Sequence, residues 1–290
     1  MITHVDHNLL LSRARLSTSR PVRPFLRWAG SKRRLLPQII PHLPQTYSRY
    51  YELFLGGGSL STLLEPPRAT LSDVSPELMN CWTQVRDCPS EVLARVRGWA
   101  LNREMYYSLR AQELADPIDR AAKFIYLNKG AFNGLYRVNR SGVFNVPWGA
   151  PKSSAVVDDT NVTAVAQWLS SSKITLRCGP FDQFLPHARR GDLVFLDPPY
   201  HSASASQRDF RHYNKDLFSW ADQVRLADLA DRARRRGAHV LVTNSTSQDI
   251  DDLYPNFVRH DLIQHSTMAA NSGRRTPVRE ALFVGSQVAL

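Results

Sequence analysis

The residues best suited to chemistry stand at positions 197–200 and read Asp-Pro-Pro-Tyr. Each proline fixes its φ angle and lacks an N–H, so the backbone is stiff and its carbonyls act only as acceptors. Asp197 and the carbonyl of Pro198 can accept the N–H bonds of an aromatic amine, and Tyr200 can stack on the ring that carries the amine. These four residues therefore predict alkylation of an exocyclic amine, without a metal or a covalent intermediate.

The element that must position Asp197 is the apolar run directly before it, Leu193-Val194-Phe195-Leu196. Four strand-forming residues that end at two prolines predict a buried strand with its carboxyl end at a turn. In an open parallel sheet, ligands bind at that end of the strands. The alternative is an ordinary Pro-Pro turn after a strand, and further motifs must decide between the two.

A second candidate binding element follows the strand predicted at residues 50–55, where Gly56 and Gly58 flank Gly57 ahead of a helical segment. Strand, glycine turn and helix form the ligand-binding opening of a doubly wound sheet. A tight turn also needs glycine when no ligand is near. Ser61 stands where a dinucleotide fingerprint has its third glycine, which argues against NAD.

The next predicted strand, residues 69–72, ends at Asp73. A carboxylate at the end of the second strand can accept hydrogen bonds from both hydroxyls of a ribose. The alternative is a surface capping residue, but the position after the glycine turn favours the ribose.

Charge points to a polyanionic partner, because 37 Lys and Arg against 26 Asp and Glu give the 290-residue chain a formal charge of +11. Nucleic acid is the first candidate for that partner. The three cysteines lack C-x-x-C spacing, which indicates neither a disulfide framework nor a zinc site and suits a reducing cytoplasm. No apolar run approaches the length of a membrane span. Residues 1–22 are basic and serine-rich, which favours a flexible basic tail over an organellar transit peptide.

Residues 127–149 interleave glycines, asparagines, aromatics and arginines with almost no acid. Such a loop can contact phosphates and present donors to base edges. It lies within a largely helical stretch, residues 79–167, that reads as an inserted lobe. A solvated polar loop is the alternative.

The Asp-Pro-Pro-Tyr tetrapeptide, the loop 127–149 and the form Phe54-x-Gly56-x-Gly58 together resemble the DNA adenine-N6 methyltransferases of the Dam type, α-group enzymes of the D12 class. The order of the motifs, with donor motifs first, recognition lobe next and Asp-Pro-Pro-Tyr last, is that of the α group. The residues that match the family's recognition loop are Asn128, Asn133, Gly134, Leu135, Arg137, Phe144, Asn145, Val146, Pro147 and Gly149.

The resemblance implies S-adenosyl-L-methionine as methyl donor, S-adenosyl-L-homocysteine as its product, and double-stranded DNA from which the target adenine is rotated out. Residues 28–32 resemble the motif that closes over the donor, with Ser31 in place of its second glycine. Lys32 would pair with the donor carboxylate, and Trp28 would pack on the donor. The implied donor site comprises Trp28, Lys32, Phe54, Gly56, Gly58, Asp73 and Asp197.

The resemblance also assigns the reading of DNA, with GATC as the expected target. Arg137 matches the loop arginine that reads a guanine, Arg27 is a second candidate, and Phe132 could wedge beside the extruded adenine. Residues 202–213, small and polar with two aromatics, suit a loop that closes over that base. The implied DNA-binding residues are Arg27, Phe132, Asn133, Leu135, Arg137 and Asn139.

The predicted fold class is α/β, a Rossmann-like S-adenosylmethionine-dependent methyltransferase sheet with an inserted helical recognition lobe. Residues 23–78 and 168–290 form the catalytic domain, and 257–263 pairs with 280–284 as an antiparallel hairpin joined by a loop at 271–275. The resemblance implies a cytoplasmic, DNA-associated enzyme of a bacterium or phage, with no membrane and no obligate protein partner. Its use in restriction-modification or in housekeeping stays open. The alternatives are an N4-cytosine or protein-glutamine methyltransferase, which tend to carry Ser or Asn where Asp197 stands, and a catalytically silent DNA-binding relative.

Overall fold

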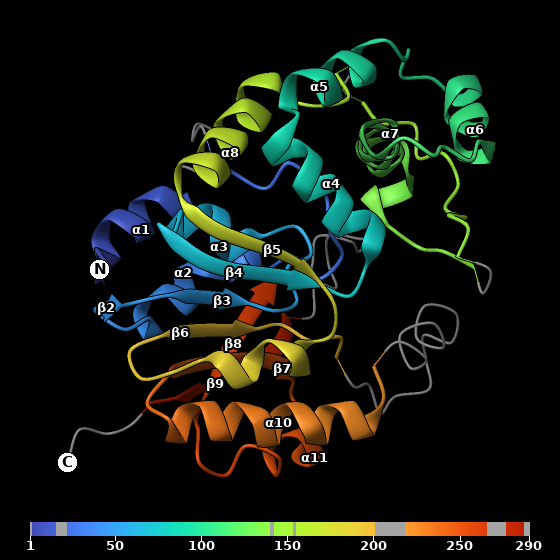
Figure 1. The fold of residues 1–290 in the computed structure, drawn as a ribbon. Coiled ribbons are helices and arrows are strands. Elements are labelled where there is room, and N and C mark those ends of the chain that lie inside the picture. Colours follow the sequence, from blue (N-terminus) through green and yellow to red (C-terminus); the bar gives the residue numbers. More distant parts are fainter. Residues whose placement is uncertain are drawn as a thin grey trace.

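The computed structural model describes residues 2–15, 22–139, 142–152, 155–200, 218–265 and 277–286 (Figure 1). The two loops expected at 202–213 and 271–275 lie outside these residues. The described strands are β1 (Thr3–His4), β2 (Thr46–Tyr47), β3 (Tyr50–Glu52), β4 (Arg68–Asp73), β5 (Lys173–Cys178), β6 (Leu193–Leu196), β7 (His239–Ser245), β8 (Val258–His265) and β9 (Pro277–Gly285).

The described α-helices are α1 (His7–Arg15), α2 (Leu36–Ile39), α3 (Ser59–Leu64), α4 (Pro76–Asp87), α5 (Pro89–Arg97), α6 (Arg103–Ala111), α7 (Pro117–Gly130), α8 (Asp159–Ser171), α10 (Trp220–Arg235) and α11 (Gln248–Asp251). Short 3-10 helices are η1 (Lys32–Arg34), η2 (Ile40–His42), η3 (Phe132–Gly134), η4 (Phe181–Gln183) and η5 (Leu185–His187). None of these helices is both long and apolar enough to cross a membrane.

Seven of the described strands form one sheet in the order β5-β4-β3-β6-β7-β9-β8. The neighbours from β5 to β7 pair in parallel, whereas β9 runs antiparallel between β7 and β8. Each strand that the sequence predicted for this sheet is present, and the antiparallel hairpin is confirmed. The predicted α/β fold class is therefore confirmed.

Strand β6 shows why this sheet is covered on both faces. Leu193 and Phe195 join the core under the helices of one face, while Val194 and Leu196 join the core on the opposite face. A parallel strand that is buried on both faces needs apolar residues at every position. Figure 1 shows the two helical layers, with α4, α5 and α8 on one side of the sheet and α10 with α11 on the other.

The stretch expected at residues 79–167 is helical, but it divides into two parts. Helices α4, α5 and α8 contribute to the core beneath the sheet. Helix α6, the carboxyl end of α7 and the loop that follows it form a second, small core of Tyr106, Leu109, Tyr126, Leu127, Ala131 and Val146. The preceding turns of α7 belong to the core beneath the sheet through Ala121, Ala122, Phe124 and Ile125. Figure 1 shows α6 and α7 away from the sheet, at the upper right. Helix α7 therefore contributes to both cores, and the extent of the inserted lobe stays a prediction.

The N-terminal segment differs from the expected flexible tail. Residues Thr3 and His4 pair with β2, and α1 packs on the main core through Leu10, which is 6% exposed. Leu10 and Ala14 are four residues apart and share one helix face, which gives this segment an apolar surface to bury. Residues 2–15 are therefore not the flexible tail that the basic composition predicted. The apolar residues at helical spacing in α1 are buried against the core, although the segment is basic overall.

Candidate active site

The predicted chemistry lies where the order of strands reverses. From β3 the chain builds outward through β4 and β5, and it returns to the other side of β3 with β6. The register pairs Glu52 of β3 with Phe195 of β6, so the glycine turn and the Asp-Pro-Pro-Tyr turn leave neighbouring strands at the same end. Asp73 ends β4 on the other side of β3. This reversal is the position where open α/β sheets bind ligands.

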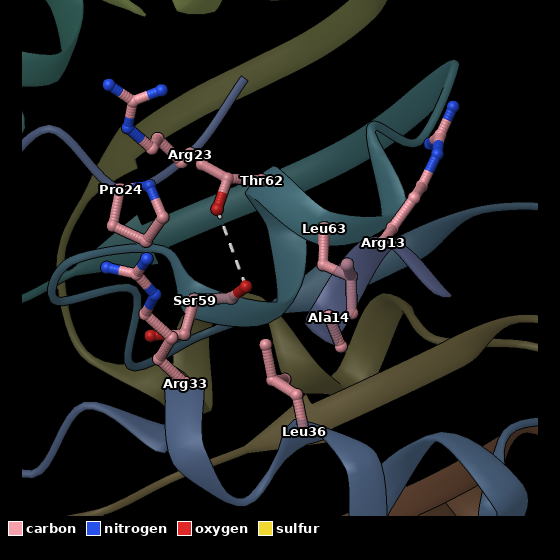
Figure 2. A pocket seen from close by; sticks show the side chains of 9 residues that line it. All are labelled: Arg13, Ala14, Arg23, Pro24, Arg33, Leu36, Ser59, Thr62 and Leu63. Atoms are coloured by element: carbon pink, nitrogen blue, oxygen red, sulfur yellow. Dashed lines mark hydrogen bonds between the residues drawn. The ribbon is translucent and has the colours of Figure 1, made fainter. Parts of the chain in front are cut away.

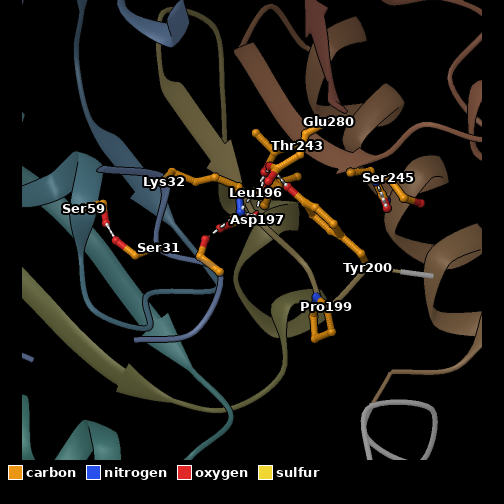
Figure 3. A network of polar contacts seen from close by, with 12 residues as sticks. Ser31, Lys32, Ser59, Leu196, Asp197, Pro199, Tyr200, Thr243, Ser245 and Glu280 are labelled. Atoms are coloured by element: carbon orange, nitrogen blue, oxygen red, sulfur yellow. Dashed lines mark hydrogen bonds and ion pairs between the residues drawn. The ribbon is translucent and has the colours of Figure 1, made fainter. Parts of the chain in front are cut away.

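The two oxygens of Asp197 have different surroundings (Figure 3). Oδ1 accepts a hydrogen bond from Thr243 Oγ1 at 2.7 Å and lies 2.7 Å from the Nζ of Lys32. Among the described residues, Oδ2 has no hydrogen-bond partner. The carboxylate is 19% exposed, and the protein fixes one of its oxygens through Lys32 and Thr243.

Lys32 supplies the buried positive charge of the site. Its side chain is 4% exposed, and Nζ donates to the carbonyl of Gly30 at 2.8 Å as well as to Asp197. Lys32 opens the short helix η1 and is the last residue of the segment 28–32, which the sequence predicted to close over the donor. In this structure Lys32 therefore pairs with Asp197, while its pairing with a donor carboxylate stays a prediction.

Tyr200 lies against both of these groups. Its ring centroid is 4.7 Å from Lys32 Nζ, and its hydroxyl donates to Glu280 Oε2 at 2.5 Å. Burial, followed by the nearby charges of Asp197 and Glu280, raises the pKa of Tyr200 well above its ordinary value. The hydroxyl is therefore a neutral donor over the working range of pH.

The carbonyls of the two prolines are not equivalent. The Pro199 carbonyl accepts from Gln223 Nε2 at 2.9 Å, and Asn244 Nδ2 donates to Gln223 Oε1 at 3.0 Å. No hydrogen bond to the Pro198 carbonyl occurs among the described residues. The buried pair Gln223 and Asn244 thus anchors the turn and leaves the Pro198 carbonyl as the acceptor beside Asp197.

The glycine turn has positive φ angles of 48° at Gly56 and 64° at Gly58. A Cβ at Gly56 would lie 2.6 Å from the ring of Trp28, and one at Gly58 would lie 2.9 Å from the ring of Trp82. Trp82 Nε1 also donates to the Gly56 carbonyl at 3.1 Å. Both the backbone conformation and the close aromatic rings therefore require glycine here.

Asp73 holds this turn from the neighbouring strand. Its two oxygens accept from the backbone N–H groups of Gly56 and Ser75, each at 3.0 Å. Burial raises the pKa of Asp73, and these backbone bonds oppose that shift. The carboxylate stands at the tip of β4 as predicted. The N-cap of α4 is Ser75, so the ribose-binding role of Asp73 stays a prediction. Phe54 packs on Phe181 nearby, with ring centroids 5.6 Å apart.

The predicted recognition residues lie on a loop that folds back on itself. An isolated bridge pairs Val138 with Phe144, and a second pairs Ala131 with Trp148. Phe132 at the start of this loop is 51% exposed, and Asn133 beside it is exposed with φ at 54°. Leu135 is half-buried.

Arg137 and Asn139 form the distal part of this loop. Arg137 is half-buried, and its Nε donates to Asn145 Oδ1 at 2.7 Å. Asn139 is exposed, and its Oδ1 accepts from the N–H of Val143 at 2.9 Å. Hydrogen bonds within the loop thus orient the polar side chains of Arg137 and Asn139, and their reading of DNA stays a prediction.

The recognition loop is joined to the donor motif by Asn128 at the end of α7. Arg27 N–H donates to Asn128 Oδ1 at 2.8 Å, and Asn128 Nδ2 donates back to the Arg27 carbonyl at 2.7 Å. The ring of Trp28 stacks on Tyr136 with centroids 5.6 Å apart. The structure therefore brings Arg27 and Trp28 between the glycine turn and the loop.

Comparison with known protein families matches residues 28–268 to "D12 class N6 adenine-specific DNA methyltransferase". The match spans most of the chain, including both turns and the recognition loop. The chain belongs to this D12 class. The choice between adenine-N6 and cytosine-N4 as the target is thereby settled for adenine, and the chain is an enzyme rather than a silent DNA-binding relative.

Several curated proteins are similar to this D12 methyltransferase over nearly their full length. The Type II methyltransferase M1.LlaDCHI of Lactococcus lactis subsp. cremoris is 35% identical, over 90% of this chain and 94% of the relative. The Type II methyltransferase M.MjaIII of Methanocaldococcus jannaschii is 35% identical, over 81% and 89%. The DNA adenine methylase of Vibrio cholerae is 30% identical, over 90% and 95%.

Sequence reasoning missed two residues that the structure places against the candidate site, Thr243 beside Asp197 and Glu280 beside Tyr200. Thr243 lies in β7 beside Asp197, and a polar residue late in a predicted strand of the sheet is a signal that could have found it. Glu280 lies in β9, and a single glutamate in the last strand carries no local signal of function. Only the antiparallel return of β9 beside β7 brings it to Tyr200.

A different part of the D12 enzyme holds a pocket next to α1 (Figure 2). Arg13, Arg23 and Arg33 line it together with Ser59 and Thr62. Arg13 lies 3.5 Å from Glu65, and Arg23 pairs with Asp158. Within the part of the chain that the structure describes, no group of three or more His, Cys, Asp or Glu side chains could hold a metal ion.

Proposed function

We propose that this enzyme transfers a methyl group from S-adenosyl-L-methionine to N6 of an adenine that is rotated out of duplex DNA, with GATC as the target. The observation that carries the proposal is the asymmetric Asp197 carboxylate, with Oδ1 fixed by Lys32 and Thr243 and Oδ2 left for the amine. A fixed acceptor needs no reorganisation during the reaction, which favours the transition state over the ground state.

The residues around the glycine turn fit the methyl donor. Asp73 stands at the tip of β4, and a pocket opens beside it that is lined by Pro76, Met79, Asn80, Thr83, Leu176, Arg177 and Cys178. An apolar hollow next to a carboxylate suits an adenine ring with its ribose diol. When bound, the donor supplies a sulfonium methyl group, and Lys32 and Trp28 would hold its other parts.

The chain's own residues prepare the amine. Asp197 Oδ2 and the Pro198 carbonyl can accept its two N–H groups, so that the nitrogen becomes tetrahedral as it is alkylated. Tyr200 offers its ring face for stacking, while its hydroxyl is held by Glu280. The proton that the amine loses passes first to an acceptor at Asp197.

Base extrusion follows from the depth of the site. Asp197 and Lys32 are 19% and 4% exposed, so an adenine within an intact duplex cannot bring its N6 to them. Enzymes that modify a base in this situation rotate it out of the stack and accept the cost of unstacking. The exposed Phe132 of the recognition loop is the candidate wedge for the gap that is left.

Sequence reading would rest on the recognition loop. Arg137 is the expected reader of a guanine, and its Nε is already oriented by Asn145 at 2.7 Å. An arginine fork matches the O6 and N7 of guanine. Arg27 is exposed at the edge of the same surface and remains the second candidate.

The experiment that tests the proposal uses the purified chain, labelled S-adenosyl-L-methionine and a DNA library of random sequence. Sequencing of the N6-methyladenine positions should return GATC. Methylation of adenine in a sequence other than GATC would support the methyltransferase activity but reject GATC as the target. No incorporation with this donor would reject the donor assignment.

A further inference from the structure

A hydrogen bond joins the last described strand to the Asp-Pro-Pro-Tyr turn. Tyr200 donates to Glu280 Oε2 at 2.5 Å, and the Glu280 side chain is 14% exposed. The register of the sheet pairs Glu280 of β9 with Ser245 at the carboxyl end of β7. A short O–H bond to a charged oxygen is among the stronger hydrogen bonds in proteins. Glu280 therefore fixes the hydroxyl of Tyr200 and with it the direction of the ring.

The same carboxylate oxygen faces Lys32. Glu280 Oε2 lies 3.7 Å from Lys32 Nζ, while Asp197 Oδ1 lies 2.7 Å from it. The buried ammonium thus stands between two carboxylates, and its charge can balance only one of them. Because the hydroxyl of Tyr200 stabilises the Glu280 carboxylate, the ammonium is left to hold Asp197 at the shorter distance.

We propose that Glu280 is a positioning residue for methyl transfer. By accepting the hydrogen bond of the Tyr200 hydroxyl, Glu280 orients the ring that stacks on the extruded adenine. Through its contact with Lys32, Glu280 also sets the position of the ammonium group relative to Asp197. The inference rests on the proposed function, because it assigns the ring and the carboxylate to one substrate base. Glu280 touches neither donor nor base and acts through Tyr200 and Lys32.

The test compares Glu280→Gln, Tyr200→Phe and the double variant in single-turnover methylation of unmethylated DNA. Glutamine keeps the size and an acceptor oxygen but removes the charge, and phenylalanine keeps the stacking face but removes the hydroxyl. Each single variant should lower the rate about 10- to 100-fold, while the dissociation constants for DNA and donor change less than about threefold. The double variant should be no slower than the more severe single variant, since contacting residues that act as a unit are not additive.

Asp261→Asn is the matched control, because it removes a carboxylate from the neighbouring strand β8, where Asp261 pairs with Arg259 at 2.9 Å. This variant should keep the wild-type rate. A wild-type rate for Glu280→Gln overturns the proposal even if the melting temperature falls, since the residue is then only structural. Multiplicative effects in the double variant overturn it as well.

Two further results keep the test decisive. If Glu280→Gln does not fold, the rate of Tyr200→Phe decides, and a wild-type rate there overturns the proposal. The Asp197→Ala variant distinguishes a failure of the proposed methyl-transfer mechanism from a failure of the role proposed for Glu280. Transfer by Asp197→Ala would refute the proposed mechanism itself, whereas an inactive Asp197→Ala beside a fully active Glu280→Gln would refute only the role of Glu280.

Discussion

At the scale of single residues, the two carboxylate oxygens of Asp197 have different roles in the proposed mechanism. Because Oδ1 is held by Lys32 and Thr243, the proposed mechanism gives the substrate amine an acceptor whose position is already set. Asp197→Ala should lower methyl transfer at least about 100-fold, since hydrogen bonds that strengthen in the transition state are lost. DNA affinity, measured by fluorescence anisotropy, should stay within about threefold. Asp228→Ala, which removes an exposed aspartate of α10, serves as the control and should be fully active.

Glu52 shows a second effect at this scale, one of pH on stability. It is 3% exposed, and its Oε2 accepts from the hydroxyl of Tyr50 at 2.9 Å and the N–H of Ser61 at 3.1 Å. Burial raises the pKa of Glu52 from 4.5 to about 8. Between these two values the folded chain binds more protons than the unfolded chain, so the free energy of unfolding falls as pH rises through this window.

The variant that tests this pH effect is Glu52→Gln, which is neutral at every pH and keeps an acceptor for both donors. The wild type should lose up to about 1.4 kcal/mol of stability per pH unit from this residue within the window. The melting temperature of the variant should therefore fall less between pH 5.5 and pH 8 than that of the wild type. Parallel curves for the two proteins would show that Glu52 is ionised in the folded state throughout.

At the scale of elements, α7 and the segment before η1 are joined through Asn128, which is 3% exposed. Asn128→Ala removes both hydrogen bonds to Arg27 and leaves its backbone groups without these partners. The free energy of unfolding should fall by about 1–3 kcal/mol. The dissociation constant for S-adenosyl-L-homocysteine, measured by calorimetry, should rise because Trp28 loses its anchor.

Asn256→Ala is the control for this prediction, since Asn256 is exposed and donates only one side-chain bond, to Asp231 Oδ1 at 3.4 Å. It should change donor affinity little. Equal losses of donor affinity in the two variants would mean that general destabilisation, and not the link from α7 to the donor motif, sets the binding.

At the scale of the whole molecule, a formal charge of +11 attracts DNA of any sequence, whereas the recognition loop must choose among sequences. Arg137→Ala should relax selectivity at one base pair by about 1–3 kcal/mol, the value of a good bidentate contact. Rates on GATC duplexes and on singly altered duplexes measure this. A uniform loss on every duplex would mean that Arg137 contacts a phosphate.

Arg97→Ala is the control for Arg137. Arg97, the last residue of α5, pairs with Asp159 of α8, and the Arg97 side chain is 61% exposed. Because this arginine lies outside the recognition loop, its removal should leave the ratio of rates on the different duplexes unchanged.

The sequence by itself determined the sheet and the two turns that leave it. The continuous apolar run at 193–196 and the glycines at 56–58 are local signals, because burial on both faces and positive φ angles restrict the residue types at those positions. The tetrapeptide that begins at Asp197 likewise carries its chemistry within four neighbouring residues.

Only the tertiary structure decided what surrounds these residues. Glu280 follows Tyr200 by 80 positions and reaches it because β9 inserts between β7 and β8. The packing of α1 on the main core and the small core between α6 and the end of α7 likewise depend on partners that are distant in the chain. A hydrogen bond or an apolar contact between distant segments leaves no periodic pattern in the sequence, since its geometry exists only once the sheet has assembled.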